Sequence, residues 1–234
     1  PYVRCKPVGD CMHEECGVFG IYCADESIEP AEAAYYGLFA LQHRGQESAG
    51  IAVSRDGKID YHKDMGLVQE VFRDSMDKLK GGHAAIGHVR YSTMGDSLVA
   101  NAQPLVISSK RGHLALAHNG NLINAKELRD ELENEGAIFQ TTIDSEVIAS
   151  LIVRHGSGDI IEGITKTLSL IKGSYALVIM TEDAVIGVRD PKGIRPICLG
   201  RIDDSFVFAS ESGALDTIGA EFVRDLRPGE IVVA

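Results

Sequence analysis

The feature that most constrains the fold is a hairpin signal around residue 56. The segment AGIAVSRDGKIDYHK places Asp56 and Gly57 between two stretches rich in alternating apolar residues. A two-residue Asp-Gly turn matches the twist of antiparallel strands, so the two stretches should be neighbours in one sheet. The segment LVISSKRGHLALAHNG, residues 105–120, predicts a second hairpin. The chain is therefore expected to contain antiparallel sheets.

Helices are predicted between groups of strands. The segment from Pro30 to Gly45 has a proline suited to the first helical position and a glycine suited to the end. Asn124 with Glu127 three residues later predicts a capping box, with the amide in place of a hydroxyl. Further helices are expected at residues 144–156, 158–173 and 212–217. Strands in groups with helices between the groups indicate an α+β fold.

Composition and charge exclude several classes of protein. The 234 residues are 44% hydrophobic, which suffices for a core without metal or disulfide crosslinks. A formal net charge of -11 argues against a nucleic-acid partner. No apolar run reaches the roughly 18 residues of a membrane helix, so we expect no membrane partner. The five cysteines have spacings that fit no compact disulfide framework, which favours a reducing, cytoplasmic setting.

Polar clusters fall at the ends of several predicted elements. They are QHRGQESAG (42–50), GHVRYSTMG (87–95), AHNGN (117–121) and TTIDSE (141–146). Functional residues often collect on such loops, because a scaffold holds the loops in place. Taken singly, each cluster is equally well explained by ordinary caps and turns: Asn119-Gly120 is a common turn dipeptide, and Asp144 is a common N-cap.

In their order along the chain, these motifs resemble one family. ECGVFGIY, LQHRGQESAG, IGHVRYSTMG, LAHNGNLINAKEL, TTIDSEV and VRDPKGIRPICLG are similar to the glutaminase domain of glutamine phosphoribosylpyrophosphate amidotransferases, from about Glu15 to the C-terminus. Other N-terminal-cysteine glutaminases, such as that of glucosamine-6-phosphate synthase, share part of this set. RDPKGIRP and FASESGALDTIGAEFVRDLRPGEI favour the purine-synthesis enzyme. Met94 stands where alanine is usual, a minor departure.

The resemblance implies a fold and a reaction. The fold is the N-terminal nucleophile hydrolase type, a four-layer αββα sandwich of two antiparallel sheets between helical layers. The reaction is hydrolysis of glutamine to glutamate and ammonia through a cysteine thioester. The ammonia then reacts with phosphoribosyl pyrophosphate to give 5-phosphoribosylamine, the first committed step of purine synthesis. Glutamine is thus the expected small-molecule partner.

The resemblance also implies a larger protein. A phosphoribosyltransferase domain is expected after residue 234, and the whole enzyme is expected to be a homo-oligomer. We expect no cofactor and no metal in residues 16–234. Magnesium, and the iron–sulfur cluster that often accompanies a propeptide in this family, would belong to the other half.

Cys16 is the implied nucleophile, with residues 1–15 as a propeptide released by cleavage between Glu15 and Cys16. A thiol is weakly ionised at neutral pH, with a reference pKa of about 8.5, and needs a base. A terminal α-amine, with a pKa of about 7.7–8.0, can accept the thiol proton and later pass it to departing ammonia. While Glu15 is attached, that nitrogen is an amide without a basic lone pair.

Five further residues have roles implied by the family motifs. Asn119 and Gly120 would donate N–H groups to the oxyanion. Arg90 would hold the α-carboxylate of glutamine, since a guanidinium grips a carboxylate with two hydrogen bonds. Asp144 would bind the α-ammonium group, and Thr93 would add a hydrogen bond. In addition, Arg44 resembles a family residue near the nucleophile, although a cation at a helix C-terminus is an equally ordinary reading.

Alternative interpretations remain open from the sequence. Cys5, Cys11, His13 and Cys16 could suggest zinc, but their gaps do not follow the paired C-x2-C spacing. His43, His88 or His118 could serve a Cys–His hydrolase, which a terminal-amine mechanism does not require. A glutaminase that feeds another synthase, and a catalytically silent glutamine-binding module, are the two competing functions. Cys23 and Cys198 are expected to fill the core.

Overall fold

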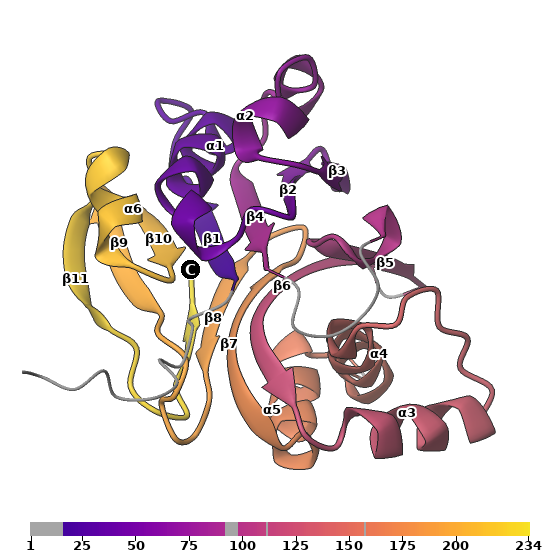
Figure 1. Ribbon diagram of the computed structural model, residues 1–234. Helices are drawn as coiled ribbons and strands as arrows, with labels where there is room; N and C mark the ends of the chain where they lie inside the picture. Colours follow the sequence, from indigo (N-terminus) through magenta and orange to yellow (C-terminus); the bar gives the residue numbers. More distant parts are fainter. Residues whose placement is uncertain (1–15, 92–97, 111, 157) are drawn as a thin grey trace, which may run out of the picture.

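The computed structural model describes residues 16–91, 98–110, 112–156 and 158–234, and it contains two sheets packed face to face (Figure 1). Their strand orders are β11-β9-β10-β1-β4-β2-β3 and β12-β8-β7-β6-β5, and all neighbours are antiparallel. The first sheet comprises β1 (Gly17–Tyr22), β2 (Ser48–Arg55), β3 (Lys58–Met65), β4 (Ala84–Arg90), β9 (Cys198–Ile202), β10 (Ser205–Ala209) and β11 (Glu221–Asp225). The second comprises β5 (Leu105–Ser109), β6 (Gly112–Leu122), β7 (Gly173–Met180), β8 (Val185–Arg189) and β12 (Ile231–Val233).

Helices cover the outer face of each sheet (Figure 1). On the first sheet lie α1 (Pro30–Ala40), α2 (Val68–Val71) and α6 (Ser212–Thr217). On the second lie α3 (Ala125–Asn134), α4 (Asp144–His155) and α5 (Ile160–Leu170). Short 3-10 turns occupy Gln42–Arg44, Met76–Leu79 and Val99–Asn101. The predicted four-layer αββα sandwich is confirmed. No helix in the described ranges is long and apolar enough to cross a membrane.

Alternation along the central strands produces three buried layers. On β1, Phe19 and Ile21 pack beneath the helices of the first sheet, whereas Val18 faces the second sheet. On β7, Val178 faces the first sheet, whereas Leu177 packs beneath the helices of its own side. Because these strands are buried on both faces, they read as nearly continuous apolar runs. Each fully buried side chain of this size contributes about 1.5–3 kcal/mol through removal from water.

The predicted hairpin turn has the geometry that its residues suggest. Asp56 and Gly57 have φ values of 51° and 71°, both in the left-handed region that a type I′ turn requires. The flanking pair Arg55 and Lys58 closes the β2–β3 register. Asp tolerates this conformation better than most residues, and Gly carries no penalty. The local sequence therefore determines this edge of the first sheet.

Two helix ends differ from the sequence-based expectation. The first helix stops at Ala40, and the chain turns through the 3-10 segment before Gly45. A Cβ at Gly45 would lie 2.6 Å from the backbone carbon of Arg90, so only glycine fits there. The prediction of a capping box at Asn124 was wrong, because its side chain makes no capping hydrogen bond to α3. Its side chain instead donates to the Leu170 carbonyl (3.0 Å) and accepts from the Lys172 N–H (2.8 Å), which ties the start of α3 to the end of α5.

Candidate active site

A small pocket lies where ends of β1, β4, β6 and α4 meet. Its lining consists of Cys16, Arg90, Tyr91, Gln103, His118, Gly120, Asn121, Ile143, Asp144 and Ser145. Four residues predicted from separate motifs, Cys16, Arg90, Gly120 and Asp144, therefore share one cavity. The β1–β4 pairing explains part of this, because Gly17 lies opposite Val89 and brings Cys16 beside the end of β4. The rest depends on the packing of the two sheets against each other.

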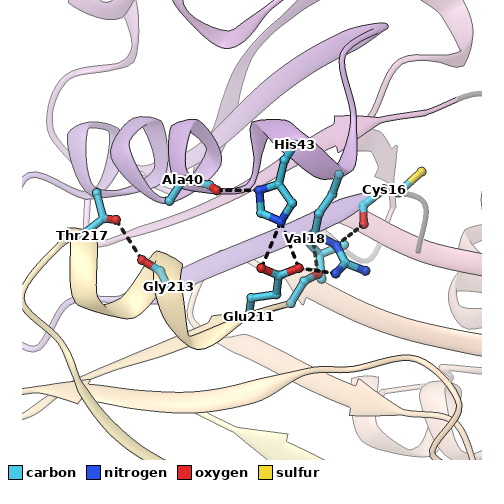
Figure 2. Close-up of polar contacts among 9 residues, drawn as sticks. Cys16, Val18, Ala40, His43, Glu211, Gly213 and Thr217 are labelled. Atoms are coloured by element: carbon cyan, nitrogen blue, oxygen red, sulfur yellow. Dashed lines mark hydrogen bonds and ion pairs between the residues drawn. The ribbon is translucent and has the colours of Figure 1, made fainter. Parts of the chain in front are cut away.

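Cys16 precedes β1 and is held through its backbone. Its N–H donates to the Arg44 carbonyl (3.1 Å), and its carbonyl accepts from Arg44 Nε (2.9 Å), as Figure 2 shows for the second contact. The thiol Sγ lies 3.6 Å from the Tyr91 carbonyl oxygen. Cys23 and Cys198 differ, because burial raises the pKa of each to about 12. Of the cysteines within the described residues, only Cys16 is partly exposed in a pocket.

Arg44 lies behind Cys16 rather than in the pocket lining. Its guanidinium is buried, and Nη1 donates to Glu211 Oε1 at 2.5 Å. His43 Nε2 lies 3.1 Å from both carboxylate oxygens of Glu211 (Figure 2). Partial burial opposes ionisation of Glu211, but the contacts with Arg44 and His43 outweigh it and lower the pKa of Glu211. Arg44 is therefore near the expected nucleophile, as the motif predicted, but its contact is with the backbone.

Arg90 ends β4 and is almost fully buried, with 3% of its surface exposed. Its Nη1 lies 3.5 Å from Oε1 of Glu47. The sequence analysis did not single out Glu47. A buried guanidinium needs a fixed anion nearby, and Glu47 supplies one. Arg90 also lines the pocket. It therefore presents a positive charge to any molecule that enters.

Asp144 opens α4, where the positive end of the helix dipole favours a carboxylate. Its Oδ2 accepts a hydrogen bond from the Leu122 N–H (2.9 Å), and Oδ1 lies 3.5 Å from His118 Nδ1. Burial opposes ionisation, but His118 and the N–H groups of Leu122 and Ser145 outweigh it, so the pKa of Asp144 lies below its ordinary value. A charged carboxylate thus stands in the same pocket as Arg90.

Asn119 and Gly120 lie near the end of β6, opposite Ala176 and Tyr175 of β7. The Asn119 side chain is fully buried, and neither its Nδ2 nor its Oδ1 has a hydrogen-bond partner among the described residues. Buried amides are nearly always paired, so this side chain needs a specific explanation. Gly120 has φ 151°, and a Cβ there would lie 2.1 Å from the Ser174 carbonyl oxygen. Only glycine can occupy this position.

Gln103 and Ser145 are among the pocket residues to which the sequence analysis gave no role. Gln103 accepts a hydrogen bond from the His118 N–H (2.8 Å), and Ser145 Oγ lies 3.1 Å from His118 Nδ1. Ser145 follows Asp144 in the TTIDSE motif but was given no role there, and Gln103, which lies just before β5, belongs to none of the motifs. Thr93, Glu15 and the rest of segment 1–15 lie outside the described residues.

The histidines considered for a Cys–His mechanism occupy different environments. His118 lines the pocket, whereas His43 contacts Glu211 outside it. His88 is fully buried and its Nε2 lies 3.0 Å from the His118 carbonyl; burial lowers the pKa of His88 to about 3, so it is neutral. Within the described ranges, no three His, Cys, Asp or Glu side chains gather as metal ligands. Cys5, Cys11 and His13 lie outside those ranges.

Comparisons with known proteins identify the family. A family model described as "Glutamine amidotransferase domain" matches residues 88–217. An amidophosphoribosyltransferase of Archaeoglobus fulgidus is 52% identical over 93% of this chain and 48% of its own length. The amidophosphoribosyltransferase of Methanocaldococcus jannaschii is 51% identical, and the match covers 93% of this chain and 46% of that protein. The chain thus spans about half the length of these curated relatives.

A solved structure supports the same assignment. The glutamine phosphoribosylpyrophosphate amidotransferase of Bacillus subtilis, complexed with ADP and GMP, superposes with a TM-score of 0.86 at 48% identity. The match covers 93% of this chain and 47% of that one. The names of these relatives agree with the family that the RDPKGIRP segment indicated, rather than with glucosamine-6-phosphate synthase. The chain belongs to the glutamine amidotransferase family and resembles the glutaminase part of amidophosphoribosyltransferases.

Proposed function

We propose that this domain hydrolyses glutamine to glutamate and ammonia, with Cys16 as the nucleophile. The observation that carries the proposal is the shared pocket, which places Cys16 with one buried cation, Arg90, and one half-buried carboxylate, Asp144. Free glutamine has an α-carboxylate and an α-ammonium at one end and an amide at the other. The lining offers a cation, an anion and a thiol, one chemical counterpart for each of these groups, and the cavity of about 30 Å³ would widen to admit glutamine.

Arg90 and Asp144 would bind the amino-acid end of glutamine. The guanidinium of Arg90 would hold the α-carboxylate, with Glu47 fixing its orientation at 3.5 Å. Asp144 would accept hydrogen bonds from the α-ammonium group through the oxygen that faces His118. Thr93 would add a hydrogen bond to the substrate. This arrangement leaves the side-chain amide of glutamine directed toward Cys16.

The chemistry would proceed through two tetrahedral intermediates. The terminal α-amine of Cys16 takes the thiol proton, and the thiolate attacks the amide carbon of glutamine. Asn119 Nδ2 and the Gly120 N–H donate to the resulting oxyanion, which would give the buried Asn119 amide a partner. The protonated amine gives its proton to the departing ammonia, leaving a γ-glutamyl thioester. Water then hydrolyses the thioester, releases glutamate and restores the thiol.

This mechanism requires that residues 1–15 act as a propeptide, cleaved between Glu15 and Cys16. The backbone of Cys16 supports the proposal, because φ 67° places a non-glycine residue in the left-handed region, at a cost of about 1–2 kcal/mol. Cleavage removes the restraint that the preceding carbonyl imposes on this torsion. The Cys16 thiol could itself attack the Glu15 carbonyl through a five-membered ring, or a separate protease could act.

In the whole protein, we propose that a phosphoribosyltransferase domain follows residue 234 and uses the ammonia with phosphoribosyl pyrophosphate to make 5-phosphoribosylamine. The support is the relatives' names and the fact that this chain covers 48% of one of them. Magnesium, any iron–sulfur cluster and the contacts of a homo-oligomer would belong to that larger protein. A cytoplasmic location agrees with the lack of disulfides among the cysteines of the described residues.

A labelling experiment tests the glutaminase proposal. A glutamine analogue with an electrophilic carbon in place of the amide should add one equivalent of mass to the peptide that begins at Cys16, in the chain without residues 1–15. Cys16→Ala should take up no label and release no ammonia from glutamine. A chain that binds glutamine but shows neither labelling nor ammonia release would instead be a silent binding module.

A further inference from the structure

We infer that Glu211 is a positioning residue for the nucleophile, acting on Cys16 through the side chain of Arg44. The inference rests on the proposed role of Cys16. Glu211 lies between β10 and α6, 167 residues from Arg44 in the sequence, and it is not part of the pocket lining. Its connection to the site is an ion pair with Arg44, followed by a hydrogen bond from Arg44 to the Cys16 carbonyl (Figure 2).

Arg44 holds Cys16 at two points. Its carbonyl accepts from the Cys16 N–H at 3.1 Å, and its Nε donates to the Cys16 carbonyl at 2.9 Å. The two contacts approach Cys16 from the same residue, so the position of Arg44 determines the orientation of the peptide unit that follows the nucleophile. The directions of the thiol and of the α-nitrogen both depend on that orientation.

Glu211 determines where the Arg44 guanidinium lies. The Arg44 side chain is 1% exposed, and Nη1 donates to Glu211 Oε1 at 2.5 Å. A buried guanidinium whose anionic partner is removed becomes strongly unfavourable, so it moves toward water or toward another anion. His43 reinforces the position of Glu211, because its Nε2 lies 3.1 Å from both carboxylate oxygens.

The backbone around Glu211 is fixed to the same strand that Cys16 begins. The neighbouring residue Ser210 donates its N–H to the Val18 carbonyl (3.0 Å), and its Oγ accepts from the Val18 N–H (2.9 Å). Val18 is two residues after Cys16. The carboxylate therefore has a backbone anchored beside the nucleophile. Because its backbone is anchored, the Glu211 carboxylate can position Cys16 through Arg44 without contacting Cys16 itself.

The expected effect of losing Glu211 is on the chemical step. A displacement of the reacting atom by about 1 Å can lower the rate by about 100-fold even when the altered residue is remote. Glutamine binding should change little, because Glu211 is not among the partners described above for Arg90 and Asp144, the residues proposed to bind glutamine. Removing Glu211 should therefore lower kcat and leave KM nearly unchanged, whereas loss of a substrate contact would raise KM.

The test starts from the full chain, and intact mass verifies for each variant that residues 1–15 have been removed. Glu211→Ala should lower kcat for glutamine hydrolysis by about 100-fold with KM within about twofold, and isosteric Glu211→Gln should give a smaller loss. The rate of Cys16 alkylation by iodoacetamide, measured without glutamine, should also fall more in Glu211→Ala than in Glu211→Gln. Glu230→Gln is the matched control, because it removes the charge from another glutamate paired with an arginine, Arg224, at 2.7 Å.

The outcomes separate this inference from the proposed function. A folded Glu211→Gln with wild-type kcat and alkylation rate would overturn the positioning role, and so would a raised KM at unchanged kcat. If Glu211→Ala fails to fold, the isosteric variant decides. If Cys16→Ala retains glutaminase activity, the proposed function fails instead.

Discussion

The two walls of the pocket differ in how their polar groups are satisfied. On the wall formed by the first sheet, the N–H and carbonyl of Cys16 both contact Arg44, and the thiol lies near the Tyr91 carbonyl. On β6, which forms the other wall, Asn119 stands between the lining residues His118 and Gly120 but does not itself line the pocket. Its buried side chain has no hydrogen-bond partner among the described residues. The backbone of Cys16 is thus held by contacts within the protein, whereas the Asn119 side chain has none within the described residues.

This difference has an energetic meaning. An unsatisfied buried polar group costs about 1–3 kcal/mol, so the Asn119 side chain lowers the free energy of unfolding. The hydrogen bonds of Cys16, in contrast, hold its backbone in place. Under the proposed function, Cys16 would be positioned before glutamine binds, whereas the Asn119 side chain would acquire a partner during the reaction.

The largest expected effect follows from Asn119. Asn119→Ala should lower kcat by about 100- to 1000-fold with little change in KM, because the donor acts on charge that develops in the transition state. Steady-state glutaminase kinetics on the processed chain measure both constants. Asn124→Ala is the control, since it removes another amide near the same sheet end, but outside the pocket. A kcat within about threefold of wild type would contradict the oxyanion role.

The same side chain allows a stability test. Asn119→Leu replaces an unsatisfied amide by an apolar group of similar size, so it should raise the free energy of unfolding by about 1 kcal/mol while it abolishes turnover. Urea unfolding of the two proteins measures the difference. A clear loss of stability would mean that Asn119 has partners in solution, and the contrast between the two walls would be weakened.

A smaller effect is expected at Arg90. Arg90→Lys keeps the charge but loses the two-point grip on a carboxylate, so KM for glutamine should rise about tenfold, equivalent to about 1.4 kcal/mol. The kcat value should change less. Arg189→Lys serves as a control for the general effect of the substitution, because Arg189 contacts three backbone carbonyls outside the pocket. An unchanged KM would exclude Arg90 from binding the α-carboxylate.

The smallest effect concerns the link between the walls. His88 on β4 contacts the His118 carbonyl on β6, and burial lowers the pKa of His88 from 6.5 to about 3. Between these values the unfolded chain binds a proton that the folded protein does not. The free energy of unfolding should therefore fall as the pH drops below 6.5, by at most about 1.4 kcal/mol per pH unit from this group.

Urea unfolding between pH 7 and pH 5 measures this slope. His88→Gln should flatten it, and the partly exposed His155→Gln should not. Equal slopes in wild type and His88→Gln would show that His88 accepts a proton in the folded protein. The two walls would then be joined by a contact that changes between pH 7 and pH 5.

Much of the fold could be predicted from local sequence. Asp56-Gly57 determines a turn, Pro30 begins a helix, and alternating apolar residues assign strands, because each signal depends on neighbours in the chain. Asn124 shows where such reasoning failed, since its amide contacts residues 170 and 172 instead of its own helix. The stacking of the two sheets came from the resemblance to a family rather than from periodicity.

The site was only partly predictable for a similar reason. Motifs identified Cys16, Arg90, Gly120 and Asp144, which share the pocket. The supporting residues Glu47 and Glu211 lie inside quoted motifs, but the motifs do not indicate their partners. Glu211 contacts Arg44 across 167 positions, and Glu47, three residues after Arg44, reaches Arg90 through the pairing of β2 with β4. Such partnerships depend on strand order and register, which no local pattern contains.

The most direct test of the account follows residues 1–15 over time. The full chain is incubated, the fraction beginning at Cys16 is measured by intact mass, and ammonia release from glutamine is measured on the same samples. Activity should rise in proportion to that fraction, because only cleavage provides the terminal amine that activates the thiol. An uncut chain that turns over glutamine at the processed rate would contradict the terminal-amine mechanism.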